Sequence, residues 1–330
     1  MRAPTGRLIA GFDAGQTHTT CRLALLNDHA GLRPLAEGSG AGVSHLAAAG
    51  GEARFRAALR TSLEAALASA AAGPAGAAPL PLAAAAVGAS GIERGSPVQE
   101  QGRLLAASAL GLDPALVTVV GDEQTALLGA LGRGPGVLVI SGTGCIALGQ
   151  NAAGGQHRCG GWGWLLDGAG SALDIGRDGL ALSVRMADGR DPETPLRQAL
   201  WQALGARTAQ EVKAAVVAPG FGAAEFARLA PVVAAAAGAG DPQARRIIAH
   251  SARALAELVG GVAQALRLEA PAVCAVGGAL EHLQPLRTGL EAALAQRLPA
   301  ARLQTPHEDA CAGALELAAA LLGHPAVRPG

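Results

Sequence analysis

Aromatic residues are scarce in this chain of 330 residues, which has four phenylalanines, three tryptophans and no tyrosine. Lysine occurs once, at Lys213, while arginine is abundant, a bias that we attribute to a GC-rich genome. The formal net charge is zero, so no overall basic field indicates a nucleic-acid partner. The sequence also lacks a secretory signal and any uninterrupted apolar run of about twenty residues. We therefore expect a cytoplasmic protein with no nucleic-acid or membrane partner.

Cysteine is also infrequent, and no two cysteines form a C-x-x-C pair. Scattered cysteines of odd number in an intracellular enzyme usually remain isolated thiols. A metal site around His157 and Cys159 lacks partner ligands at a zinc-like spacing, so we expect no structural metal. The five positions are Cys21, Cys145, Cys159, Cys274 and Cys311.

The apolar pattern predicts strands that alternate with helices, in a chain long enough for two domains. A helix is expected over 51–70, because Phe55, Leu59, Leu63 and Leu67 recur every four residues. A Pro/Gly/Ala connector follows at 70–81, further helices at 98–110 and 309–322, and a mostly helical stretch up to residue 267. Strands are predicted at 7–13, 20–27, 33–37, 82–87, 116–120 and 272–276.

Two stretches have the same pattern, an apolar strand, a small polar turn and a second apolar strand. The first is GFDAGQTHTT at 11–20, and the second is GVLVISGTGCIALGQ at 136–150. Backbone N–H groups and hydroxyls in such turns can converge on an anion, although each turn alone is equally consistent with a plain hairpin. Two such hairpins in separate halves indicate a duplicated fold.

Three further features complete a set that phosphoryl transfer from a nucleotide requires. An acid, Asp13, lies in the first turn, another acid, Asp122, follows a strand, and Gly277-Gly278 follows a late strand. Such enzymes need donors for the phosphates, a carboxylate for Mg²⁺ and a base for the attacking hydroxyl. Asp122 has a second interpretation, since aspartate is favoured as a helix N-cap.

Taken in order, these segments resemble the BadF/BadG-type ATPases, which include N-acetylglucosamine kinases, within the actin/hexokinase/Hsp70 superfamily. The resemblance covers almost the whole chain, and the second loop combined with CGGWGW is its most specific part. The matching segments are GFDAGQTHTT, GDEQTALLGAL at 121–131, LVISGTGCIALGQ, CGGWGWLLDGAGSALDIGRDGL at 159–180, AVGGALEHLQPLR at 275–287 and EDACAGALELA at 308–318.

The resemblance implies an α/β fold of duplicated actin-like (ribonuclease H-like) domains, with mixed sheets flanked by helices and a cleft between the domains. The expected division is 1–118 plus 313–330 for the N-terminal domain and 119–312 for the larger C-terminal domain. The implied activity is ATP-dependent phosphorylation of an amino sugar, N-acetylglucosamine or glucosamine, at a hydroxyl, at O6 in the leading hypothesis. The family also implies a homodimer.

The resemblance assigns roles to individual residues. Asp122 would be the general base, and Asp13 would organise Mg²⁺ through water. Phosphate and nucleotide contacts would come from Gly15, Gln16, Thr17, Gly142, Thr143, Gly144, Gly277 and Gly278. Sugar contacts would come from His45, Thr143, Gly161, Trp162 and Asp167.

This chain departs from its relatives mainly where the sugar would bind. The N-acetylglucosamine kinases usually have asparagine at the position of His45, and acids at the positions of Gly168 and Ala169. Asp167 lies one residue earlier and could replace the missing carboxylate only if the turn shifts register. His45 could hydrogen-bond a hydroxyl or be an exposed loop histidine. Glucosamine, another amino sugar or a non-sugar hydroxyl therefore stay open as acceptors, because buried polar groups discriminate strongly between such ligands.

Two tryptophans in a glycine-rich loop are poorly explained as core residues in a chain this poor in aromatics. We predict that Trp162 contacts the sugar and that Trp164 packs. Two alternative functions stay open. One is an ATPase activator of acyl-CoA dehydratases, whose iron–sulfur cluster would need Cys145 and Cys159. The other is a sugar-binding regulator that has lost catalysis, suggested by the changes at His45 and Gly168.

Overall fold

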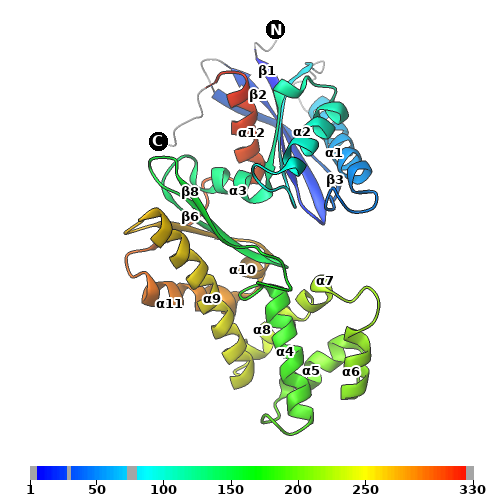
Figure 1. The fold of residues 1–330 in the computed structure, drawn as a ribbon, viewed down its shortest axis with the longest axis vertical. Helices are drawn as coiled ribbons and strands as arrows, with labels where there is room; N and C mark the ends of the chain where they lie inside the picture. Colours follow the sequence, from blue (N-terminus) through cyan, green and yellow to red (C-terminus); the bar gives the residue numbers. More distant parts are fainter. Residues whose placement is uncertain (1–5, 28–30, 73–79, 325–330) are drawn as a thin grey trace. The chain divides into compact units, whose positions relative to one another are not determined.

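The computed structural model describes residues 6–27, 31–72 and 80–324. It divides into two compact units, each with its own sheet (Figure 1). Unit 1 contains residues 1–133 and 306–330, and unit 2 contains residues 134–305. These boundaries differ from the expected ones at 118/119 and 312/313, because the helix that begins at Asp122 packs within unit 1 against the last helix of the chain.

The sheet of unit 1 has the order β3-β2-β1-β4-β5. The chain enters as an antiparallel meander, as the sequence predicted, through β1 (Arg7–Ala14), β2 (His18–Asn27) and β3 (Gly31–Ala41). Two parallel strands, β4 (Leu82–Ala89) and β5 (Val117–Gly121), extend the other side of β1. Part of the predicted turn at 27–31 and most of the 70–81 connector lie outside the described residues.

Helices cover both faces of this sheet because the side chains of a strand alternate between its faces. Phe12 belongs to the cluster that packs with Phe55 and Leu59 of α1 (Gly51–Ala72), which confirms the predicted apolar stripe. Ile9 points into the other cluster, against α12 (Ala310–Leu321). The remaining helical elements are α2 (Pro97–Leu110), the 3-10 turn η1 (Pro114–Leu116) and α3 (Asp122–Leu131).

Close approach of α12 to the sheet depends on one glycine. A Cβ atom on Gly11 would lie 2.6 Å from the backbone oxygen of Cys311 and 2.7 Å from the backbone nitrogen of Leu315. Only a residue without a side chain fits there, and α12 consequently packs directly on β1 and β4. In Figure 1 this helix, drawn in red, lies against the strands of unit 1.

The sheet of unit 2 repeats the topology of unit 1, with the order β10-β9-β6-β7-β8. β6 (Gly136–Ser141), β7 (Cys145–Gln150) and β8 (Gln156–Gly160) form the antiparallel meander. β9 (Ala272–Val276) and β10 (Arg302–Gln304) continue it in parallel on the other side of β6. Each strand thus has a counterpart in unit 1, which confirms the duplicated, actin-like fold expected from the two hairpins.

Helices fill the rest of unit 2, and the long helix α9 (Pro242–Leu266) packs across β6, β7 and β8. A single large core of aliphatic residues joins these helices to the sheet. In the described part of the chain, no helix is long and apolar enough to cross a membrane. The other helices of the unit are α4 (Ala172–Ala187), α5 (Pro195–Leu204), α6 (Ala209–Val216), α7 (Ala223–Ala227), α8 (Ala230–Gly238), α10 (Gly278–His282) and α11 (Gln284–Arg297).

Candidate functional site

The carboxyl ends of the three parallel strands of unit 1 lie at one edge of its sheet. Asp13 is the penultimate residue of β1, Ser90 follows β4, and Asp122 follows β5. Parallel pairing brings the ends of these strands together, with Asp13 opposite Gly88 and Ala89 opposite Gly121. In open α/β sheets, ligands bind beyond such strand ends. Two acids that are far apart in the sequence therefore become neighbours here.

The charges of these two acids influence each other. The pKa of Asp13 is raised to about 6, first by burial and then by the negative charges of Asp122 and Asp309, while nearby His18 opposes this rise. Burial also raises the pKa of Asp122, although hydrogen bonds, including one with the Ser90 side chain, oppose this shift. Like charges that share a partly buried site favour protonation unless a cation neutralises them.

Asp122 is the first residue of α3 and not its N-cap, a position that Gly121 occupies instead. Its Oδ1 atom accepts a hydrogen bond from the backbone N–H of Glu123 at 3.0 Å. The alternative interpretation as a capping aspartate is therefore wrong for this helix. An acid in the first turn is still stabilised by the helix dipole, which favours negative charge at this end.

The first predicted phosphate turn is an open loop tip between β1 and β2. Gln16, Thr17 and His18 are exposed, and the backbone N–H of Gly15 donates to the carbonyl of His18 at 3.0 Å. Gln16 Nε2 lies 3.4 Å from Ser90 Oγ, which connects the turn to the strand ends just described. The hydroxyl of Thr17 is paired with His18 Nδ1 at 3.0 Å.

His45 belongs to the same edge of unit 1, in the segment that follows β3. The backbone N–H of Val43 donates to the carbonyl of Gly15 at 2.9 Å, so this segment is attached to the first turn. A Cβ atom on Gly91 would lie 3.2 Å from the His45 ring, which therefore sits beside the turn that carries Ser90. His45 is exposed and within reach of a ligand at this edge.

Sequence reasoning missed an ion-pair cluster next to Asp13. Arg22 of β2 donates to both carboxylate oxygens of Asp309, at 2.8 and 2.6 Å, and to Glu37 at 2.5 Å. Asp309 also caps α12 by accepting from the Ala312 N–H at 3.0 Å. Arg22 lies opposite Glu37 in adjacent antiparallel strands, a register that the local sequence pattern does not give.

In unit 2, the second hairpin is a tight turn at Ser141–Cys145. The N–H of Gly142 donates to the carbonyl of Gly144 at 2.8 Å, and the buried Ser141 hydroxyl donates to the Gly170 carbonyl at 2.7 Å. Gly142 and Gly144 do not have positive φ, and a Cβ atom on either would meet nothing within 4 Å. Neither the backbone nor the packing of unit 2 therefore requires glycine at these two positions.

The Gly277-Gly278 pair lies next to this hairpin. Gly277 has φ of 100°, and a Cβ atom there would lie 2.5 Å from the carbonyl oxygen of Ser141, so glycine is structurally required. Gly278 begins α10 and has room for a side chain, since the nearest atom, of His282, would be 3.8 Å away. Unit 2 thus brings its two predicted glycine-rich segments side by side.

The loop after β8 presents apolar side chains to solvent. Trp162 is 62% exposed, with the Arg158 guanidinium 4.6 Å from its ring centroid. Trp164 is 43% exposed, so the packing role predicted for it is not observed. Gly161 is exposed and has φ of 75°. Asp167 is half-buried, and its backbone N–H donates to the Gly163 carbonyl at 2.9 Å.

The cysteines that an iron–sulfur cluster would need are engaged or covered. Cys145 is buried, and its thiol donates to the Ala169 carbonyl at 3.2 Å. Burial raises the pKa of Cys145 to about 12, and burial also raises that of Cys159. Both thiols are therefore disfavoured as the exposed thiolates that a cluster shared between two subunits requires.

Comparison with known proteins places these features in context. A Clostridium acetobutylicum N-acetylmuramic acid/N-acetylglucosamine kinase is 29% identical over 61% of this chain and 67% of its own length. A Dictyostelium discoideum N-acetyl-D-glucosamine kinase is 33% identical over 58% of this chain and 61% of its own length. The solved structure of a Chromobacterium violaceum protein assigned as an N-acetylglucosamine kinase matches with 31% identity and a TM-score of 0.73, covering 96% of this chain and all of that one.

A family model extends the comparison over nearly the entire sequence. It matches residues 10–318, a range that includes both glycine-rich hairpins, Asp13 and Asp122 of unit 1, and the exposed tryptophan loop of unit 2. Because this match spans far more than half of the chain, the chain belongs to the BadF/BadG/BcrA/BcrD ATPase family.

Proposed function

We propose that the protein is an ATP-dependent kinase that phosphorylates an amino sugar, N-acetylglucosamine or glucosamine, at its O6 hydroxyl. The observation that carries this proposal is that Asp13 and Asp122 both lie where parallel strands end, at the same edge of the sheet of unit 1. The names of three relatives, all kinases of N-acetylglucosamine, support the substrate class. We further expect a cytoplasmic homodimer, whose mass light scattering would measure.

Asp122 is the general base of the proposed reaction. The sugar hydroxyl attacks the γ-phosphorus of ATP, a new O–P bond forms, and the bond to the bridging oxygen of the leaving ADP breaks. The hydroxyl proton passes to the carboxylate of Asp122. Because burial raises the pKa of Asp122, this carboxylate accepts a proton more readily than an exposed aspartate does.

A divalent cation fits the residues of this edge. The negative charge of Asp122 contributes, after burial, to the raised pKa of Asp13, and Asp309, which is paired with Arg22, adds a third carboxylate. Mg²⁺ held by Asp13 through water would neutralise charge on the phosphates. Asp13 must be ionised to hold Mg²⁺, so the kinase activity should depend on pH.

Phosphate contacts are proposed for both turns. In unit 1 these are the half-buried Gly15 and the exposed Gln16 and Thr17, and in unit 2 they are Gly142, Thr143 and Gly144. The absence of any packing or backbone reason for glycine at 142 and 144 supports a ligand as the reason. Gly277 and Gly278 would border the adenine ring, and phosphoryl transfer needs little more from the protein than such positioning.

The acceptor is proposed to contact His45, Thr143, Gly161, Trp162 and Asp167. A Cβ atom at Gly168 would lie 3.5 Å from the Leu173 side chain, an ordinary contact distance, so packing does not exclude a side chain at its first carbon. We take the loss of the acid at this position as a change in recognition. This supports a preference that differs from that of the N-acetylglucosamine kinases, and glucosamine is the first alternative.

An acceptor screen with Asp122→Asn tests this proposal. The enzyme is incubated with Mg-ATP and N-acetylglucosamine, glucosamine or N-acetylmuramic acid, and sugar-dependent ADP release is measured. We expect turnover with an amino sugar, and loss of kcat by about a hundredfold or more in Asp122→Asn. Asp113→Asn is the matched control, since Asp113 caps a 3-10 turn elsewhere in unit 1.

Three outcomes would contradict the assignment. Unchanged turnover in Asp122→Asn would remove Asp122 from the reaction. Phosphorylation of an acceptor that lacks the 6-hydroxyl, such as the 6-deoxy analogue of the best sugar, would show that O6 is not the site of transfer. Binding of sugars without any phosphotransfer would leave a regulator as the function.

A further inference from the structure

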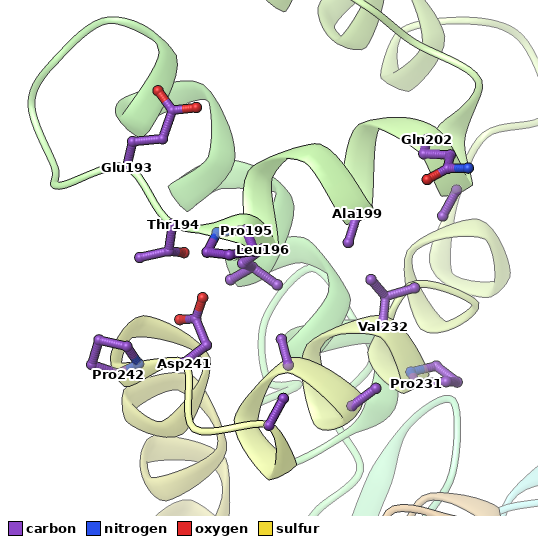
Figure 2. Close-up of a pocket in the computed structure, with 14 residues that line it drawn as sticks. Glu193, Thr194, Pro195, Leu196, Ala199, Gln202, Pro231, Val232, Asp241 and Pro242 are labelled. Atoms are coloured by element: carbon purple, nitrogen blue, oxygen red, sulfur yellow. The ribbon is translucent and has the colours of Figure 1, made fainter.

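A groove of ≈ 960 Å³ in unit 2 lies between α5, α8 and the start of α9, apart from every residue assigned above (Figure 2). Its walls are mainly aliphatic, and nothing among the described residues indicates which ligand or partner would occupy it. The strand ends of unit 1 are more informative, because Gln16, Ser90 and Asp122 are joined there by hydrogen bonds that the proposed reaction has not yet used.

Ser90 lies at the end of the middle one of the three parallel strands. β4 is the neighbour of both β1 and β5, and Ser90 is the first residue after it. The backbone N–H of Ser90 donates to the carbonyl of Ala14 at 3.0 Å, which attaches it to the end of β1. On the other side, Ala89 pairs with Gly121, so Ser90 reaches the level of Asp122. The half-buried Ser90 therefore lies between the first turn and the proposed base.

The two hydrogen bonds of the Ser90 hydroxyl have a direction. Gln16 Nε2 donates to Ser90 Oγ at 3.4 Å, and the Ser90 side chain is hydrogen-bonded to the carboxylate of Asp122. A hydroxyl has one proton to donate, and an ionised carboxylate can only accept. The proton of Ser90 is therefore directed to Asp122, while the Gln16 amide occupies a lone pair of the same oxygen. Hydrogen bonds that end on a charged acceptor are stronger than neutral ones, and the members of a chain strengthen one another.

The other groups around Asp122 do not attach it to the sheet. The backbone N–H of Glu123 donates to Asp122 Oδ1 at 3.0 Å, and the Glu123 side chain also forms a hydrogen bond with Asp122. That side chain is folded back over the start of α3, since a Cβ atom on Gly121 would lie 2.2 Å from Glu123 Oε2. Asp13 on β1 contributes only negative charge. Glu123 belongs to the same helix as Asp122, whereas Ser90 connects Asp122 to the end of β4.

We propose that Ser90 is a positioning residue for Asp122, and that Gln16 holds the Ser90 hydroxyl in the orientation that this requires. The proposal rests on the role of Asp122 as general base. Such a base must stay within hydrogen-bond reach of the hydroxyl that it deprotonates, and a displacement of about 1 Å can cost a hundredfold in rate. Because Gln16 lies in the turn proposed to contact the phosphates, the chain also links that turn to the base. The second N–H of the Gln16 amide stays available for a phosphate oxygen.

Steady-state kinetics of Ser90→Ala with Mg-ATP and the best acceptor of the screen above tests the proposal. We expect kcat to fall about tenfold, as for the loss of one hydrogen bond to a charged group, while KM for ATP and for the acceptor changes by less than about twofold. Ser90→Thr keeps the hydroxyl and should retain most of kcat. Ser62→Ala is the matched control, because this buried hydroxyl donates within its own helix, to the Ala58 carbonyl at 2.8 Å, and its loss should leave kcat unchanged.

Double variants separate positioning from a general loss of structure. The amide in Asp122→Asn cannot act as the base, so Ser90→Ala should lower kcat no further in that background. Gln16→Met keeps the length of the side chain without its amide. It should lower kcat severalfold in the otherwise unmodified protein and leave kcat unchanged in the Ser90→Ala background. A purely structural role of Ser90 would instead lower activity equally in every background.

Denaturant unfolding of Ser90→Ala, Asp122→Ala and the double variant keeps this inference apart from the kinase assignment. If the two side chains are hydrogen-bonded, the midpoint shift of the double variant should differ from the sum of the single shifts. Absence of phosphorylation of every acceptor would remove the kinase assignment, and this cycle would then decide whether Ser90 orients Asp122. Turnover with unchanged kcat in Ser90→Ala, equal losses in both backgrounds, or additive unfolding shifts would each overturn the proposal. Should Ser90→Ala fail to fold, Gln16→Met, at an exposed position, still tests it through kcat.

Discussion

Asp13 is a carboxyl group whose surroundings oppose its charge. Burial raises its pKa, and the carboxylates of Asp122 and Asp309 act in the same direction. The charged carboxylate of Asp13 destabilises the ligand-free protein, and a bound cation would offset this cost. Residues of this kind show how a functional site is retained at a cost to stability.

The stability of the ligand-free protein should therefore depend on Asp13 with a defined sign. Its folded pKa of about 6 exceeds the unfolded value of 3.8, so the folded state binds more protons between these values and stability falls as pH rises from about 4 to 6. Asp13→Asn should raise the free energy of unfolding at pH 7 by on the order of 2 kcal/mol while abolishing kinase activity. Denaturant unfolding at pH 4 and pH 7 measures this, and an equal effect at both would contradict it.

Gly142 is the residue at which the phosphate role can be separated from folding. Since a Cβ atom there meets nothing within 4 Å, Gly142→Ala should change stability by less than about 0.5 kcal/mol. If the backbone approaches a phosphate at this turn, the same methyl group should weaken ATP binding about tenfold. Thermal unfolding and nucleotide titration are the two measurements, and unchanged affinity would remove Gly142 from the nucleotide site.

At the scale of elements, α3 and α12 pack so closely that their contact is between backbones. A Cβ atom on Gly313 would lie 2.1 Å from the carbonyl oxygen of Thr125, and one on Gly129 would lie 1.9 Å from that of Asp309. This packing fixes the first turn of α3, and therefore Asp122, relative to the start of α12.

Gly313→Ala should for this reason destabilise the protein by about 1–3 kcal/mol, although alanine is the better helix former. A Cβ atom on Gly238, the last residue of α8, would meet nothing within 4 Å, and Gly238→Ala is the matched control. There we expect a gain of up to about 1 kcal/mol. Chemical denaturation compares both, and a stabilised Gly313→Ala would contradict the close contact.

Most elements could be predicted from the sequence because their apolar periodicity is strong, as in α1 and in the strands β1, β4 and β9. β8 was missed since Gln156–Gly160 is polar and lies in a glycine-rich stretch, and β10 because it has only three residues. α11 was missed although Leu286, Leu290 and Leu294 recur every four residues and are buried, which is a signal that the sequence does contain. Asp13 was found through a glycine-rich turn and Asp122 through its place after a strand, but Ser90 and the Arg22–Asp309 pair depend on strand order, which local pattern does not encode.

At the scale of the whole molecule, unit 2 is a continuous segment, while unit 1 is assembled from both ends of the chain. Unit 2 has its own large core and complete sheet. We expect a fragment of residues 134–305 to fold alone, with cooperative thermal unfolding and helical circular dichroism. The fragment 1–133 without α12 should not, because the second face of its sheet would be uncovered. A cooperative transition in 1–133 would contradict this.

The position of α12 at the end of the chain has a consequence for biosynthesis. When the ribosome has completed β1 to β5, the apolar side chains of Ile9 and Ala84 still lack the helix that will cover them. All of unit 2 must be translated before that helix emerges, which at about 5–20 residues per second leaves the nascent sheet exposed for many seconds. Unit 1, which is synthesised before unit 2, is thus completed after it. Chaperone dependence during translation should be greatest for variants that weaken the packing of α12 against Gly11.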